Sequence, residues 1–317
     1  MRAAFSEALV RLAKADPKVL LLTGDHGYAL FDDFRRACPA QYINAGIAEQ
    51  NMVGMAAGLA RTGFRPFVYG LSAFIPVRVL EQIKLDIAHD HLPVILIGDG
   101  AGFVYSHLGT SHQSTEDIAC TRAIPDLSVY SPADRFEVSV CMELAYQSKS
   151  PVYLRMGKSD RGDVHRQMPP ASIGGLLPIQ QGQVGGVSFI ATGSMVRTAL
   201  DIATADYPDV TVWSAPFIKP LDQRQVAAIC AQSCAVVALE EHSVLGGLGS
   251  AIAEIAAELA PVRILRVGVQ DRFSQHCGTY EYLLQEHGLD RPAIEQRIRD
   301  FLKVNPHLSP SHMRNNY

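Results

Sequence analysis

The sequence lacks the features of membrane, secreted and nucleic-acid-binding proteins. Its 317 residues contain no run of 18 apolar residues and no charged-then-apolar leader, so neither a membrane span nor a signal peptide is predicted. Basic residues are not in excess, because 28 lysines and arginines stand against 32 acidic residues and the formal net charge is −4. A basic surface for nucleic acid is therefore not expected.

The cysteines also lack a recognisable pattern. The six of them form no C-x-x-C pair, which is the usual core of a zinc or redox motif. We interpret them as reduced thiols of a cytoplasmic protein, since disulfides are rare in that compartment. These residues are Cys38, Cys120, Cys141, Cys230, Cys234 and Cys277.

Short apolar runs alternate with amphipathic segments along the chain, which is typical of parallel α/β sheets. Strands are predicted near residues 19–22, 41–44, 66–69, 94–97, 127–130, 152–155, 187–190, 210–213, 235–239 and 263–267. Helices are predicted near residues 2–15, 48–62, 73–90, 115–122, 133–147, 195–205, 222–231, 248–258 and 280–302. The predicted fold class is therefore α/β, with two parallel-sheet domains.

A change in composition divides the chain into these two domains. Prolines, glycines and polar residues gather after residue 158, where they break regular structure. We place the first domain at residues 1–165, a linker at 166–184 and the second domain at 185–317. The tail from Asn305 is expected to be frayed.

The segment from Gly46 to Asn51 carries the most informative charge. It reads G-I-A-E-Q-N and leads into a helix rich in alanine and glycine, so its carboxylate, Glu49, stands at a helix start. A carboxylate at this place complements the helix dipole. In a closely packed interface it can instead carry a proton for chemistry. The residues alone leave both interpretations open.

Several motifs together resemble one family. The G-I-x-E-Q pattern around Glu49 is similar to the signature of the pyrimidine-binding domain of transketolases and deoxyxylulose-phosphate synthases. Residues 111–118, S-H-Q-S-T-E-D-I, resemble the T-H-Q-x-x-E-D segment of that family. Segments of the second half that resemble the transketolase C-terminal domain are residues 189–194, 218–222 and 240–249. The resemblance covers nearly the whole chain and implies a thiamine-diphosphate-fold pyrimidine domain followed by a transketolase C-terminal domain.

The resemblance implies which residues lie near the cofactor. Glu49 would hydrogen-bond the aminopyrimidine ring of thiamine diphosphate and activate the cofactor, and Ile47 of the same motif would contact it. Phe74 follows Ser72 and Ala73 where relatives read S-T-F, so it would stack on the aminopyrimidine. The alternative for Phe74 is an ordinary helix core residue.

The resemblance also implies residues for the substrate. His112 would be a second catalytic residue near the substrate hydroxyls and carbonyl, where a histidine can pass protons. Arg155 ends a strand and would grip a substrate phosphate, unless it is a surface arginine in a salt bridge. Asp25 and His26 lie on a loop that contributes to the same cleft in relatives.

One substrate position departs from the family. Relatives often read E-D-G before the T-H-Q segment, whereas this chain has His107-Leu108-Gly109. The missing aspartate contacts a donor-sugar hydroxyl in relatives, and Leu108 cannot accept a hydrogen bond. We therefore expect His107 to bind substrate from the adjacent position, and the preference among ketoses to be altered.

A further part of transketolases is not recognisable in this sequence. Their diphosphate- and Mg²⁺-binding domain carries a G-D-G motif followed further on by an Asn. Gly98-Asp99-Gly100 is similar to the start of that motif, but residues 122–132 offer no Asn, so no metal ligand is predicted in this chain. The resemblance therefore implies a partner subunit that holds the diphosphate and Mg²⁺, in an α2β2 assembly.

The resulting hypothesis is a β-type subunit of a split transketolase, which moves a two-carbon ketol unit between sugars or sugar phosphates. One alternative is half of a deoxyxylulose-phosphate-synthase-like enzyme or of a 2-oxo-acid dehydrogenase or decarboxylase. Another is a non-catalytic interaction subunit. The activating carboxylate Glu49 argues against that last alternative, because such a protein has no need of it.

Overall fold

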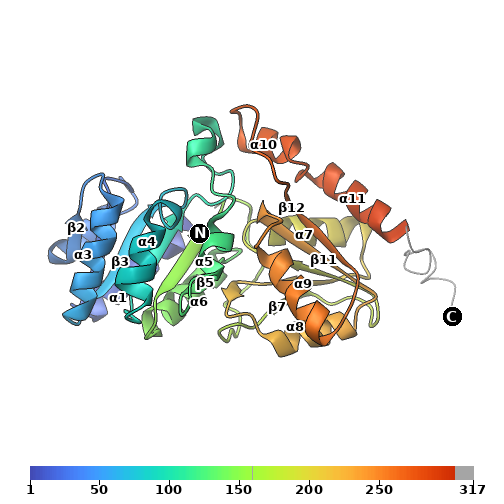
Figure 1. Ribbon diagram of the computed structural model, residues 1–317, viewed down its shortest axis with the longest axis horizontal. Helices are drawn as coiled ribbons and strands as arrows, with labels where there is room; N and C mark the ends of the chain where they lie inside the picture. Colours follow the sequence, from blue (N-terminus) through green and yellow to red (C-terminus); the bar gives the residue numbers. More distant parts are fainter. Residues whose placement is uncertain (159, 304–317) are drawn as a thin grey trace.

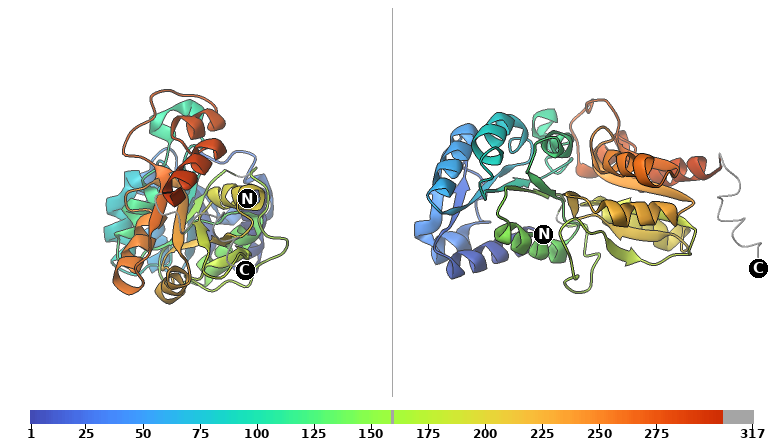
Figure 2. Two further views of the ribbon diagram at one scale, coloured as in Figure 1. Left: turned by 90° about the vertical axis from the view of Figure 1, so that its right-hand side faces the viewer. Right: turned by 60° about the horizontal axis from the view of Figure 1, so that its bottom comes forward.

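The computed structural model describes residues 1–158 and 160–303, which form two α/β lobes side by side (Figures 1 and 2). Among the helices of these residues, none has both the length and the apolar character needed to cross a membrane. The predicted frayed tail from Asn305 lies outside the described residues. The predicted fold class is confirmed, since each lobe holds a mixed, mostly parallel sheet between helices.

Within the described residues, the first lobe has a seven-stranded sheet in the order β10-β5-β6-β4-β3-β1-β2. Neighbouring strands are parallel, except that β10 is antiparallel to β5. The strands are β1 (Val19–Thr23), β2 (Tyr42–Asn44), β3 (Arg65–Leu71), β4 (Ile95–Asp99), β5 (Ser128–Tyr130), β6 (Val152–Met156) and β10 (Phe217–Lys219).

Strand β1 shows why helices cover both faces of this sheet. Leu20 and Leu22 enter one buried layer and Val19 and Leu21 enter the other, because successive side chains of a strand point to opposite faces. A strand that is apolar along its whole length therefore needs cover on both sides. One face is covered by α1 (Arg2–Ala15), α2 (Asp32–Ala37) and α6 (Arg135–Gln147), and the other by α3 (Glu49–Arg61), η3 (Ile83–Ala88) and α5 (Asp117–Arg122).

The second lobe repeats this plan around a five-stranded sheet of described residues, in the order β12-β11-β8-β9-β7. Its strands are β7 (Leu177–Gln180), β8 (Val187–Ala191), β9 (Thr211–Ser214), β11 (Ala235–Ser243) and β12 (Ile264–Val269). Helices α7 (Met195–Asp206), α10 (Tyr280–Glu286) and α11 (Arg291–Lys303) pack on one face, and α8 (Gln223–Ala231) and α9 (Leu248–Leu259) on the other.

Two strands correct the predicted division of the chain. β7 lies inside the predicted linker 166–184 and pairs antiparallel with β9, so this part belongs to the second sheet. β10 belongs to the second half of the sequence but extends the sheet of the first lobe. Both strands are short edge strands, and such pieces carry too little alternation to be recognised from the sequence.

Two predicted helices are interrupted. The predicted helix 73–90 is a turn followed by η2 (Val77–Val79), α4 (Leu80–Gln82) and the π-helical segment η3. Pro76 accounts for the late start, because proline lacks an N–H and keeps the preceding residue out of the helical region. The predicted helix 280–302 divides into α10 and α11 at Gly288, whose φ of +65° suits a residue without a side chain.

Candidate functional site

The carboxyl ends of four neighbouring parallel strands meet at one edge of the first sheet. β2, β1, β3 and β4 are adjacent, so the segments that follow them share that edge. In open α/β sheets this is the edge where ligands bind. The predicted site residues on these segments are Asp25, His26, Ile47, Glu49, Phe74, His107 and His112.

Glu49 begins helix α3, and the structure buries it to 5% exposure. Its Oε2 accepts a hydrogen bond from Nη1 of Arg78 at 3.1 Å. Its Oε1 is buried and has no hydrogen-bond partner among the described residues. A buried acceptor without a donor is costly, so this oxygen can take a hydrogen bond from a ligand that enters the cluster.

Phe74 packs against two histidines and is linked to Glu49 through Arg78. The Phe74 ring packs edge to face with His112, at 5.2 Å between ring centroids, and with His26, at 6.2 Å. The guanidinium carbon of Arg78 lies 4.0 Å from the centre of the same ring. The structure thus brings four predicted residues into one cluster, and Phe74 lies in a half-buried turn rather than in a helix core.

Arg78 is the member of the cluster that sequence reasoning missed. Its position four residues after Phe74 was the only sequence feature that linked it to the site. A regular helix over residues 73–90 does not predict a contact between Arg78 and Glu49. The interruption of that helix by the turn and η2 produces the contact.

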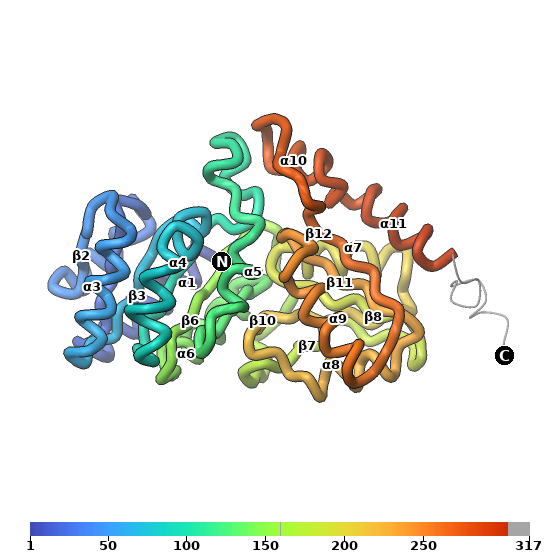
Figure 3. Tube along the Cα trace, viewed as in Figure 1, coloured from blue at the N-terminus to red at the C-terminus, as the bar shows by residue number. Residues whose placement is uncertain are grey.

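The remaining predicted residues lie around this cluster. Asp25 accepts a hydrogen bond from Nδ2 of Asn44 at 3.3 Å, while Ile47 is 77% exposed. His107 is exposed on η4 (Ser106–Leu108), which rises beside α10 at the top of the molecule (Figure 3). Leu108 is 46% exposed there and gives this surface an apolar side chain.

Arg155 does not lie at this edge as an open guanidinium. Its side chain is 2% exposed, and Nε donates to Oδ2 of Asp117 at 2.8 Å. Nη2 donates to the carbonyl oxygens of Glu241, at 2.8 Å, and of Ser114, at 3.3 Å. Glu241 belongs to the second lobe, so Arg155 joins the two lobes. This position argues against the predicted phosphate role and also against the surface salt bridge.

Asp99, in the segment that is similar to a metal-binding motif, accepts hydrogen bonds from side chains at the sheet edge. Its Oδ2 accepts hydrogen bonds from Arg2 at 2.7 Å, Tyr69 at 2.8 Å and Tyr105 at 3.1 Å. Burial, followed by the charge of Asp99, raises the pKa of Tyr105 to about 12. Within residues 1–158 and 160–303, no cluster of three or more His, Cys, Asp or Glu side chains is arranged to hold a metal ion.

Two further carboxylates, next to each other on β11, are buried. Glu241 accepts from the N–H of Phe103 at 2.7 Å and from the hydroxyls of Ser194 and Tyr280. Glu240 accepts from the N–H groups of Leu248 and Gly249, at 2.7 and 2.9 Å, at the start of α9. Burial raises the pKa of Glu240 to about 7, although these N–H groups act to lower it.

This raised pKa predicts a pH-dependent difference between the wild type and Glu240→Gln. Folding favours the protonated carboxyl, so its contribution to stability is complete below the unfolded-state value of 4.5 and is lost as the pH rises through about 7. From pH 4.5 to pH 8 the wild type should therefore lose about 3 kcal/mol of unfolding free energy relative to the variant. Urea unfolding at several pH values measures this, and a constant difference would show that Glu240 does not titrate there.

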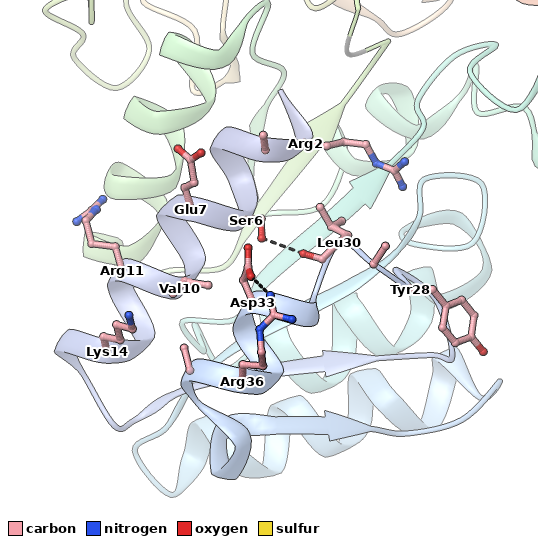
Figure 4. Close-up of a pocket in the computed structure, with 13 residues that line it drawn as sticks. Arg2, Ser6, Glu7, Val10, Arg11, Lys14, Tyr28, Leu30, Asp33 and Arg36 are labelled. Carbon is pink, nitrogen blue, oxygen red and sulfur yellow. Dashed lines mark hydrogen bonds and ion pairs between the residues drawn. The ribbon is translucent and has the colours of Figure 1, made fainter.

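A large groove of the described residues lies elsewhere. Its volume is about 1050 Å³, and it runs between α1 and the segment from Tyr28 to Ala37 (Figure 4). Ser6 donates to the carbonyl of Leu30 across it at 2.9 Å, and Asp33 pairs with Arg36 on its wall. None of the cluster residues around Glu49 lines it, so the groove is not the candidate site.

Comparison with known families assigns both lobes. Residues 1–162 match the transketolase pyrimidine binding domain, and residues 181–294 match the transketolase C-terminal domain. The chain is 31% identical over 307 residues to one of the subunits of the apulose-4-phosphate transketolase of Phocaeicola vulgatus, and the match covers 95% of this chain and 97% of that protein. It is 32% identical over 298 residues to a 6-deoxy-6-sulfo-D-fructose transketolase subunit of Clostridium sp. strain MSTE9, covering 93% and 92%.

The fold of the chain is also similar to that of a solved structure. It is described as a split gene transketolase in an inactive β4 tetramer, and it matches with a TM-score of 0.87 at 33% identity, covering 96% of this chain and 98% of that chain. The chain therefore belongs to the transketolase family, as a split-transketolase subunit with the pyrimidine-binding and C-terminal domains.

Proposed function

We propose that this member of the transketolase family activates thiamine diphosphate for the transfer of a two-carbon ketol unit between sugar phosphates. The observation that carries the proposal is Oε1 of Glu49, which is buried without a hydrogen-bond partner among the described residues. A protonated ring nitrogen of an aminopyrimidine is a donor of the kind that this oxygen lacks.

The residues around Glu49 fit such a ring. Phe74 offers a half-buried aromatic surface, and His26 and His112 pack against it. Exposed Ile47, in the turn before α3, is the remaining candidate contact with the cofactor. Bound thiamine diphosphate supplies the nucleophilic carbon and the electron sink that carbon–carbon bond cleavage needs. The part of Glu49 is to hold or exchange the proton at the pyrimidine nitrogen, in a place from which water is excluded.

We propose that the substrate binds beside His26 and His112 of the cluster. Oγ of Ser111 lies 3.0 Å from Nδ1 of His112, a contact that orients the imidazole and leaves Nε2 for a substrate hydroxyl or carbonyl. His26 and Asp25 on the loop after β1, and His107 on η4, are the proposed sugar-binding residues. Arg155 is not among them, because Asp117 and two carbonyl oxygens occupy its guanidinium.

The names of the two relatives support a phosphorylated or similarly anionic sugar. One relative is named for apulose 4-phosphate and the other for a sulfonated fructose, so both substrates carry an anionic group. The family resemblance implies that Leu108 stands in place of a hydrogen-bonding carboxylate, and we infer that the donor ketose makes no hydroxyl contact there. A panel of ketose phosphates that differ in configuration at each hydroxyl would measure this preference.

We further propose that a companion polypeptide binds the diphosphate and Mg²⁺, in an α2β2 enzyme. Both relatives are named as single subunits of their transketolases, which supports a companion for this chain. The related β4 tetramer is described as inactive, which fits a β-type subunit that needs its companion.

This predicts that the purified chain alone gives no ketol transfer with thiamine diphosphate and Mg²⁺, whereas the complex with the companion subunit gives robust transfer. Coupled assays with ketose phosphate donors and aldose phosphate acceptors measure it, and pyruvate serves as the competing donor. Turnover by the single chain would refute the split assignment. Use of pyruvate with CO₂ release, without ketol transfer, would instead support the 2-oxo-acid alternative.

A further inference from the structure

The guanidinium of Arg78 fills the space between Glu49 and Phe74. Nη1 lies 3.1 Å from Oε2 of the carboxylate, and the guanidinium carbon lies 4.0 Å from the centre of the aromatic ring. One planar cation thus pairs with a carboxylate oxygen and covers a ring face at the same time. An aminopyrimidine that bonds Glu49 and stacks on Phe74 would need that same space.

We propose that Arg78 is the resident counter-ion of Glu49 and competes with the cofactor, so that its guanidinium must leave the carboxylate and the ring before the aminopyrimidine binds. The inference rests on the proposed function. It adds to that function a step in cofactor loading that is built into this chain.

Burial explains why Glu49 needs a counter-ion. The side chain of Glu49 is 5% exposed, and a charge removed from water is costly unless it is paired. Arg78 supplies the pairing through one charge-assisted hydrogen bond. The other carboxylate oxygen stays without a partner among the described residues, so Arg78 pairs with only one side of the carboxylate.

Exposure explains how Arg78 can leave. Its side chain is 47% exposed, so the guanidinium can turn into water without being stripped of hydration. Its backbone lies in η2, a three-residue turn, rather than inside a regular helix. The exchange therefore needs a rotation of one long side chain and no rearrangement of the sheet.

The first test is a double-mutant cycle on the chain alone, with thermal unfolding as the readout. Arg78→Ala should lower Tm by about 3 °C or more in the wild type, because Glu49 is left buried and unpaired. In the Glu49→Gln background the same change should have almost no effect, because there is no charge to balance. The matched control is Arg61→Ala, since Arg61 pairs with Asp90 at 2.6 Å on the surface and should shift Tm by about 1 °C or less. Equal shifts from Arg78→Ala in both backgrounds would overturn the counter-ion assignment.

The second test measures thiamine diphosphate binding by calorimetry, using the complex of the chain with its companion subunit and Mg²⁺. Arg78→Ala should bind more tightly than the wild type, on the order of tenfold if the open arrangement is populated about a tenth of the time. Arg61→Ala should bind as the wild type does. Unchanged or weaker binding by Arg78→Ala would overturn the competition, while the proposed function would stand. If neither the wild type nor Arg78→Ala binds, the proposed function fails and the competition fails with it.

Discussion

Glu49→Gln should reduce turnover of the complex about 10²–10⁴-fold while leaving the chain folded. Glutamine keeps the size of the side chain and one carbonyl oxygen, but it cannot share a proton with the pyrimidine nitrogen. The proton at that nitrogen matters to every later step, so we expect the upper end of the range. Steady-state turnover, together with exchange of the reactive thiazolium proton of bound thiamine diphosphate against D₂O, measures both consequences.

A second variant separates cofactor activation from substrate chemistry. His112→Ala should slow turnover and leave thiazolium exchange near the wild-type rate, because His112 contacts Phe74 and is assigned to the substrate. Glu49→Gln should slow both processes. If exchange in Glu49→Gln runs at the wild-type rate, Glu49 is a structural residue and the central proposal is wrong.

The strands and the Glu49 cluster were the most predictable parts of this protein. Runs such as Val19 to Leu22 are apolar throughout, and only a strand covered on both faces buries all of their side chains. Glu49 follows β2 and Phe74 follows β3, so the parallel topology brings both residues to one edge.

Contacts that depend on the other lobe were not predictable. Arg155 ends a strand as expected, but its burial depends on Glu241, 86 residues later in the chain. A local pattern cannot distinguish a guanidinium that faces a ligand from one that faces a second domain. The same holds for β10, whose pairing with β5 joins segments with no shared sequence signal.

Arg78 was hidden for a different reason. A regular helix over residues 73–90 would have placed it by the helical period, but the turn around Pro76 changes its direction. A proline in the sequence indicates that the helix is interrupted. The direction of the chain after the interruption depends on packing, which the sequence does not show. The cluster could therefore be located from the sequence, but its electrostatic pairing could not.

Arg155→Ala should lower the unfolding free energy of the chain by about 3–5 kcal/mol, which is the largest stability effect we expect. The side chain of Asp117 is 0% exposed. After the change its carboxylate keeps one hydrogen-bond donor, the hydroxyl of Tyr153 at 2.7 Å, and loses its positively charged partner. The carbonyl oxygen of Glu241 loses the Arg155 donor at the same time, while that of Ser114 keeps the N–H of Gly102 at 2.8 Å. Urea unfolding measures the effect.

A matched control and a double variant distinguish a structural role of Arg155 from a phosphate-binding role. Arg11→Ala breaks the exposed pair with Glu143 and should change the unfolding free energy by about 0.5 kcal/mol or less. Adding Asp117→Asn to Arg155→Ala should recover part of the loss, because the buried negative charge is then removed together with its partner. A phosphate-binding arginine would behave in the opposite way. Its alanine variant would keep wild-type stability and raise KM for phosphorylated sugars alone, and that result would return Arg155 to the substrate site.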